Sequence, residues 1–131
     1  MAKARRVNRS RPAECQCLPE VMPDDVRRAL DEGGGLEGLL SRIPDSRELE
    51  AEAEVHGALA DPNRLRIMHM LVRSPLCVCV IRTAMDMPDS KLSYHLGVLK
   101  SAGLVVSKKR GNFITYSLSD QGSRWHETCS D

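Results

Sequence analysis

The sequence predicts a small α+β domain, mainly α, in which two helices joined by a short turn are followed by a two-stranded β-hairpin. Three patterns predict it: helical segments bounded by capping residues and prolines, a leucine stripe within residues 89–102, and alternating β-branched runs at 104–107 and 113–118. A length of 131 residues allows one domain with a modest core. Aromatic residues are few, so we expect an aliphatic core that borrows area from a second subunit.

Composition divides the chain into four segments. We expect a flexible, basic, cysteine-bearing arm at 1–22, a short helical extension at 23–45, the main domain at 46–120, and a tail or short dimerisation helix at 121–131. In the extension, Asp24 and Asp25 begin a helix that Gly33 ends, and the apolar spacing from Leu36 to Ile43 predicts a second.

The main domain begins with two helices. Asp45-Ser46 caps the first, which runs to Leu59 with a solvated acidic face. Asp61-Pro62 starts the second with an N-cap aspartate followed by proline at the first helical position, and Ser74-Pro75 stops it.

A helix-turn-helix is expected next. The cysteine-bearing stretch Leu76–Ile81 opens a helix that runs to Met85, and Asp89 or Ser90 caps a second helix that ends at Gly103. The second helix, here called the reader helix, has an apolar stripe of Leu92, Leu96 and Leu99 opposite a polar face of Lys91, Ser93, Tyr94 and His95. The two β runs that follow enclose a basic tip at 108–112, so the hairpin is the wing of a winged helix-turn-helix.

Charge is strongly segregated although the net charge is only +1. Residues 62–118 carry nine basic and two acidic residues, whereas residues 18–61 carry four basic and twelve acidic ones. A basic block of this size predicts a polyanionic partner, here double-stranded DNA. No apolar run approaches the ~18 residues of a membrane span, so neither membrane insertion nor secretion is expected and the protein should be cytoplasmic.

Two groups of residues are the predicted DNA contacts. The reader helix would present its polar side chains to the major groove, and the wing would touch phosphate or the adjacent minor groove. Because these side chains specify few bases, we expect a symmetric dimer on an inverted-repeat operator. The predicted contacts are Ser90, Lys91, Ser93, Tyr94 and His95 in the helix and Lys108, Lys109 and Arg110 in the wing.

The order of motifs along residues 50–120 resembles the ArsR/SmtB family of metal-responsive winged-helix repressors. The stretches that carry the resemblance are Ala58–Ile67, Leu76–Cys79, Ser90–Leu99 and Ala102–Val105. The resemblance implies a homodimeric repressor that a bound ion releases from its operator. The Leu-Cys-Val-Cys box is diagnostic of thiolate-sensing branches, although Val80 stands where they usually carry an acidic residue. The cadmium/lead branch also has a cysteine pair on an N-terminal arm, which implies binding across the dimer.

The predicted metal ligands are Cys15, Cys17, Cys77 and Cys79, since a cytosolic protein keeps its thiols reduced and clustered thiolates suit soft ions. Residues i and i+2 of a regular helix point about 200° apart, so Cys77 must lie at or before the first turn. Four thiolates suit Cd(II), Pb(II) or Zn(II), and three suit As(III) or Sb(III). The arsenic branch that uses only the helix needs a third cysteine where this chain has Arg82. The family's C-terminal zinc site should be absent, because it needs a histidine two residues after the aspartate and Gly122 stands two residues after Asp120. No organic cofactor is expected.

Other interpretations of the thiols remain open. They could be small buried hydrophobic residues, or a redox or persulfide switch with a disulfide between arm and helix. A zinc-stabilised interaction module and a small thiol enzyme are more distant alternatives, and we expect no enzyme because no His, Asp or Gly-rich loop is placed for catalysis. Cys129 is expected to be incidental, and His56 and His69 to be partly buried structural residues.

Overall fold

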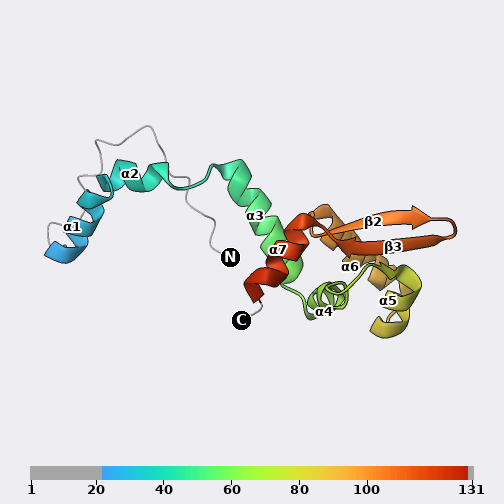
Figure 1. The fold of residues 1–131 in the computed structure, drawn as a ribbon. Helices are drawn as coiled ribbons and strands as arrows, with labels where there is room; N and C mark the ends of the chain where they lie inside the picture. Colours follow the sequence, from blue (N-terminus) through green and yellow to red (C-terminus); the bar gives the residue numbers. More distant parts are fainter. Residues whose placement is uncertain (1–21, 130–131) are drawn as a thin grey trace. The chain divides into compact units, whose positions relative to one another are not determined.

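The computed structural model describes residues 22–129 (Figure 1). The chain divides into two compact units with the boundary between Ser46 and Arg47. No helix among the described residues is both long and apolar enough to cross a membrane. The elements, in order, are α1 (Asp24–Glu32), α2 (Gly35–Ser41), α3 (Ser46–Leu59), α4 (Pro62–Met70), β1 (Leu76–Cys77), α5 (Val78–Met85), α6 (Asp89–Ser101), β2 (Val105–Arg110), β3 (Phe113–Leu118) and α7 (Asp120–Cys129).

The first unit contains the two short helices that the glycine and proline spacing predicted. Gly33 ends α1, and Gly34 enters α2 with a φ of 89°, a conformation that glycine adopts without strain. Arg42 Nη1 donates a 2.8 Å hydrogen bond back to the carbonyl of Gly33, which closes the pair of helices. Neither helix buries a residue, so this unit adds little to a core.

The core lies in the second unit and is aliphatic, as the low aromatic content predicted. Leu92, Leu96 and Leu99 of α6 are all buried, which confirms the predicted leucine stripe. They cluster with residues of α3, α4, α5 and β2, so the reader helix is held by most of the domain. The buried apolar residues are Ala58, Ile67, Met68, Leu71, Ile81, Met85, Leu92, Leu96, Leu99, Ala102, Leu104 and Val105.

The start of α4 follows the predicted capping pattern. Asp61 Oδ1 accepts hydrogen bonds from the backbone N–H groups of Asn63, at 2.8 Å, and Arg64, at 3.1 Å, with Pro62 at the first helical position. The bond from the Arg64 N–H is the largest influence holding the pKa of Asp61 below its ordinary value. The Asp61 side chain therefore fixes where α4 begins.

The sheet has three antiparallel strands in the order β1-β3-β2. The hairpin was predicted, but its basic residues were wrongly placed in a loop: β2 continues to Arg110, and only Gly111 and Asn112 form the turn. Gly111 has a φ of 59°, as the first central residue of a tight hairpin turn requires. Strand β1 was not predicted. Its two residues pair with Tyr116 and Thr115 of β3, where the sequence predicted the start of a helix.

The C-terminal residues form a helix, α7, whose start is fixed by Ser119. The Ser119 hydroxyl accepts from the N–H of Gly122 at 3.0 Å and donates to the carbonyl of Gly103. Gly122 is buried, and a Cβ there would collide with the carbonyl oxygen of Leu104. Contact between α7 and the loop before β2 therefore requires glycine at position 122. A role for α7 in dimerisation stays a prediction.

Replacing Gly122 with alanine should destabilise the fold by about 1–3 kcal/mol, because the new methyl group meets backbone that has no room to move. The matched control is Gly97→Ala in α6, where a Cβ meets nothing within 4 Å. That change should stabilise by about 0.5–1 kcal/mol through helix propensity. Urea unfolding followed by circular dichroism measures both, and a Gly122→Ala protein as stable as wild type would contradict the close approach.

Candidate DNA interface and thiol site

The reader helix α6 exposes four of the five side chains predicted to contact DNA. Ser90, Lys91, Ser93 and Tyr94 are exposed, and Tyr94 keeps 64 % of its surface in solvent. These residues occupy the first half of the helix, opposite the buried leucines. Short polar side chains and one large aromatic on an exposed helix face are a suitable surface for the major groove of DNA.

His95 was wrongly placed on that polar face. It is only 4 % exposed and approaches Arg64 of α4, with 3.2 Å between its Nδ1 and Arg64 Nη1. Positions 92, 95, 96 and 99 follow the i, i+3, i+4, i+7 spacing of one helix face, so His95 belongs to the leucine stripe. The helical spacing alone predicts that His95 is buried, but its polarity led to its assignment to the exposed face.

His56 and His69 also differ from the prediction that they are partly buried. His56 has 73 % of its side chain exposed and lies 3.8 Å from Glu52. His69 is exposed and meets the edge of Trp125, with 5.2 Å between ring centroids. Both follow apolar neighbours in the sequence, but each lies on the outer side of its helix.

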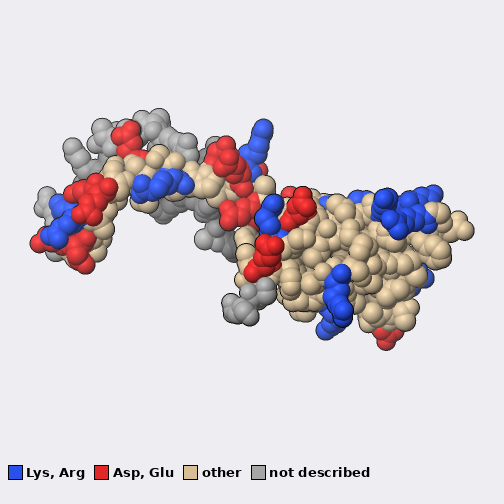
Figure 2. Space-filling model, in the orientation of Figure 1, with Lys and Arg blue, Asp and Glu red and all other residues tan. Residues whose placement is uncertain are grey.

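The wing presents its cations on two opposite faces. All three are exposed, and Figure 2 shows Lys and Arg atoms gathered over the hairpin. Strand side chains alternate, so Lys108 and Arg110 share one face while Lys109 lies on the other, opposite Ile114 in the register. Lys100, in the last turn of α6, donates a 2.7 Å hydrogen bond to Ser107 of β2. This contact links the reader helix to the wing.

The thiol pair lies where β1 passes into α5. Cys77 is the N-cap residue of α5, with φ −66° and ψ 142°, and Cys79 lies in the first turn. As the geometry of a regular helix required, Cys77 precedes that turn. The extended backbone turns the two side chains toward each other, and the Cys79 thiol donates to Cys77 Sγ with the sulfur atoms 2.8 Å apart. The two sulfur atoms therefore lie together on one side of the chain.

The two thiols differ in acidity. The hydrogen bond from the Cys79 thiol, helped by the backbone N–H groups of Cys79 and Val80, lowers the pKa of Cys77. Donating that bond raises the pKa of Cys79. Cys77 is therefore the first of the pair to become a thiolate, the form that binds metal ions.

The described residues do not by themselves form a metal site. Within 22–129, no group of three or more His, Cys, Asp or Glu residues is placed to hold an ion. Cys15 and Cys17 lie outside the described residues, and Cys129 is exposed at the end of α7. Beside the pair, Cys79, Val80, Thr83 and Ala84 line an open hollow of about 410 Å³. The two described thiols of the pair thus lie next to an open, largely apolar surface.

An ion pair connects the thiol-bearing helix to the reader helix. Arg82, one turn after Cys79, has its Nε 3.1 Å from Asp89 Oδ1 in the first turn of α6. Both side chains are at least half exposed, so the pair contributes little stability. The ion pair spans the turn between α5 and α6, so it links the position of the thiol-bearing helix to the start of the reader helix.

Comparison with known proteins places this fold and these motifs in one family. Residues 61–107 match the model of the bacterial regulatory proteins of the arsR family. A transcriptional repressor SmtB homolog of Synechocystis sp. is 46 % identical over 68 residues, covering 52 % of each chain. The arsenical resistance operon repressor of Escherichia coli is 40 % identical over 68 residues, covering 51 % of this chain and 58 % of that protein.

The decisive match is longer. The HTH-type transcriptional repressor SmtB of Mycobacterium tuberculosis is 38 % identical over 111 residues, which cover 78 % of this chain and 81 % of that protein. The chain belongs to the ArsR/SmtB family. It spans only about half of the length of the Synechocystis and Escherichia coli relatives.

The structure agrees with membership of the ArsR/SmtB family. A homodimeric winged helix-turn-helix DNA-binding domain from Mycobacterium bovis aligns with a TM-score of 0.58 and 28 % identity, covering 67 % of this chain and 84 % of that domain. That domain is described as a winged helix-turn-helix, the arrangement that α5, α6, β2 and β3 form here. This ArsR/SmtB chain therefore has the winged helix-turn-helix fold.

The unequal thiols of this ArsR/SmtB protein predict an order of deprotonation. Alkylation by iodoacetamide should have a lower pH midpoint at Cys77 than at Cys79, because only the thiolate reacts and the pKa of Cys77 is lowered. Cys79→Ala removes the donated hydrogen bond and should raise the Cys77 midpoint, whereas Cys129→Ser should leave it unchanged. Peptide-resolved mass spectrometry measures each site, and a Cys77 midpoint above that of Cys79 would contradict the assignment.

Proposed function

We propose that this chain is a DNA-binding transcriptional repressor that leaves its operator when a soft metal or metalloid ion binds Cys15, Cys17, Cys77 and Cys79. The observation that carries the proposal is the convergence of Cys77 and Cys79 at the start of α5, one helix before the reader helix of an ArsR-family fold. Named relatives are repressors, one of them of an arsenical resistance operon, which supports an ion as effector.

The DNA-binding part rests on the exposed face of α6 and on the wing. Ser90, Lys91, Ser93 and Tyr94 would contact base edges and phosphates in the major groove, and the cations of β2 would contact the flanking backbone. One such helix reads few bases. A homodimer on an inverted repeat supplies a second copy, and a homodimeric structural neighbour supports this arrangement.

The ion-binding part rests on the chemistry of the donors. Sulfur ligands favour Cd(II), Pb(II), Zn(II), As(III) or Sb(III) over hard cations. Two thiols from α5 are fewer than any of these ions needs, and Cys15 and Cys17 are the remaining pair in the sequence. Binding would draw residues 15–17 to the start of α5, close to the hollow beside Cys79 and Val80.

Two structural connections carry the effect of ion binding to the DNA-binding elements. Cys77 pairs with Thr115 of β3, one strand of the wing. Arg82 contacts Asp89 at the start of α6, so the negative charge of bound thiolates competes with Asp89 for Arg82. Allosteric coupling free energies are typically about 1–3 kcal/mol, and by linkage DNA weakens ion binding by the same factor.

A thiol switch is the second candidate, favoured by the lowered pKa of Cys77 and its contact with Cys79. In this version an oxidant removes two electrons and two protons from one arm thiol and one α5 thiol, forming a disulfide. DNA release would then follow oxidation and would be reversed by a dithiol reductant without any metal.

The test compares binding of the reduced protein to its DNA with and without Cd(II), Pb(II), Zn(II) and As(III). The DNA is a duplex that wild type selects from a random-sequence pool, and affinity is measured by fluorescence anisotropy. At least one ion should weaken wild-type binding by about 5–150-fold. Cys77→Ser and Cys15→Ser should bind the duplex normally but lose this response.

Cys129→Ser is the matched control, since Cys129 lies at the far end of α7, and it should respond like wild type. Ultraviolet thiolate-to-metal charge-transfer bands report ion binding separately, and they should disappear in Cys77→Ser. Release by mild oxidant but by no ion would favour the thiol switch. Unchanged bands in Cys77→Ser would exclude that cysteine as a ligand.

A further inference from the structure

We infer that the hydrogen bond between Arg64 and His95 sets the orientation in which the reader helix meets DNA. His95 is therefore a positioning residue that acts through its neighbours on α6, not a DNA contact. The inference rests on the DNA-binding part of the proposed function and is independent of the ion. It concerns the buried imidazole of His95, which belongs neither to the exposed DNA-facing surface nor to the thiol site.

The protonation of His95 follows from its partner. A guanidinium group has donors only, so Arg64 Nη1, 3.2 Å away, must donate to His95 Nδ1. The ring is then neutral and carries its proton on Nε2. Within the described part of the chain, Nε2 is buried and has no hydrogen-bond partner. The Arg64 bond is thus the polar contact that compensates for burying this imidazole, and its loss would leave both ring nitrogens unsatisfied.

Arg64 is itself held at the meeting point of three helices. Its Nε donates to the carbonyl of Ala58 at 2.6 Å, and its Nη2 lies 3.4 Å from the carbonyl of Gly57, so it caps the end of α3. Its backbone N–H is bound by Asp61 at the start of α4. The remaining nitrogen, Nη1, reaches α6. One side chain therefore ties the end of α3 to α4 and to the reader helix.

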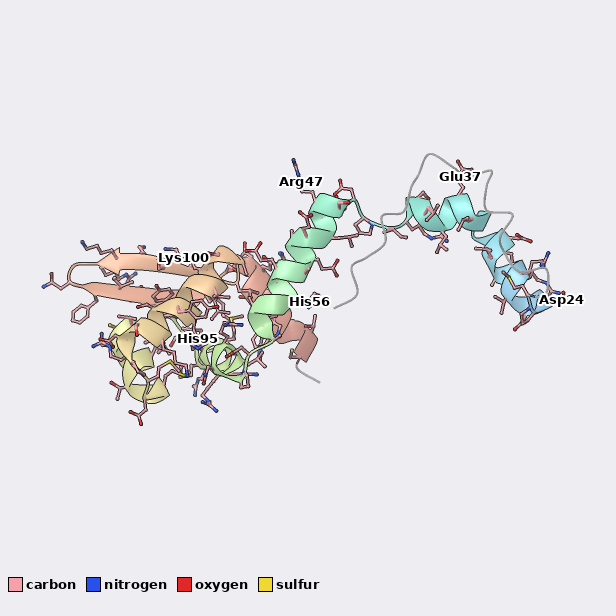
Figure 3. The ribbon with its side chains drawn as sticks, turned by 180° about the vertical axis from the view of Figure 1, so that it is seen from behind. Asp24, Glu37, Arg47, His56, His95 and Lys100 are labelled. Carbon is pink, nitrogen blue, oxygen red and sulfur yellow. The ribbon has the colours of Figure 1, made fainter. Side chains whose placement is uncertain are left out.

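The position of His95 in α6 transmits this restraint to the DNA-facing side. Tyr94 is adjacent to His95 and is 64 % exposed, and its ring centroid lies 5.6 Å from that of His95. Because helix residues share one rigid backbone, rotating α6 to release His95 would rotate Ser93 and Tyr94 in the same sense. Figure 3 labels His95 on α6, and only 4 % of this residue is exposed to solvent.

The chain offers a matched pair of substitutions at this position. The amide oxygen of asparagine can occupy the place of Nδ1 and accept from Arg64, whereas glutamine places its amide near Nε2. Both are neutral and polar, so they differ mainly in the retained acceptor. Arg64→Lys is a third variant. Lysine keeps the charge, but its single nitrogen cannot reach Ala58 and His95 together as the separate nitrogens of the guanidinium group do.

The experiment measures affinity for the duplex selected by wild type and for an unrelated duplex of equal length and base composition. His95→Gln and Arg64→Lys should lose tenfold or more of the affinity for the selected duplex and little for the unrelated one. His95→Asn should stay within about threefold of wild type. Equal losses on both duplexes would indicate general destabilisation and overturn the positioning role, as would normal affinity of His95→Gln.

A second measurement does not involve DNA. Long-range ¹H–¹⁵N correlation spectra of the full wild-type chain should show His95 as the neutral tautomer protonated on Nε2. The spectrum should change in Arg64→Lys, even if His95→Gln fails to fold. A ring protonated on Nδ1 would overturn the inference. Failure of wild type to enrich any duplex would instead overturn the proposed function and leave this tautomer result standing as a separate observation.

Discussion

The extended backbone at Cys77 is the constraint on which the thiol site depends. A regular helix would turn residues 77 and 79 away from each other, but ending β1 at Cys77 and starting α5 at Val78 brings their sulfur atoms within 2.8 Å. The same backbone pairs Cys77 with Thr115 of the wing strand. A change in geometry at the thiols therefore acts on a residue that belongs to the sheet of the wing.

The reader helix is held from several sides, and on the function proposed here small changes elsewhere would alter how it meets DNA. The leucines of α6 lie in the core, and its His95 accepts a hydrogen bond from Arg64. Asp89 of α6 contacts Arg82, and Lys100 of α6 donates to Ser107 of the wing. The buried contacts define its position, whereas the exposed ion pair with Arg82 is weak and can be exchanged. Buried contacts thus come from α3, α4, α5 and β2, and the thiol-bearing helix α5 adds the weak ion pair.

Local patterns predicted most of the helices and the hairpin. Asp61-Pro62, the leucine stripe and the glycines at 33 and 111 each act within a few residues, so the sequence shows them directly. Strand β1 was missed because two residues carry no periodicity, and only the distant β3 makes them a strand. His95 was misplaced because histidine is polar and its hydrogen-bond partner, Arg64, lies 31 residues away, although the helical spacing puts His95 in the leucine stripe. Whether Cys15 and Cys17 complete the site depends on residues that lie outside the described range.

The central claim is that the Cys77–Cys79 pair is half of a thiolate site completed by Cys15 and Cys17. Cadmium X-ray absorption spectroscopy of the loaded, reduced full-length protein counts the sulfur neighbours of the ion directly. The account predicts sulfur from all four cysteines in wild type and a smaller sulfur count, with oxygen or nitrogen replacing it, in the Cys15→Ser/Cys17→Ser double variant. An identical sulfur count in the two proteins would contradict it.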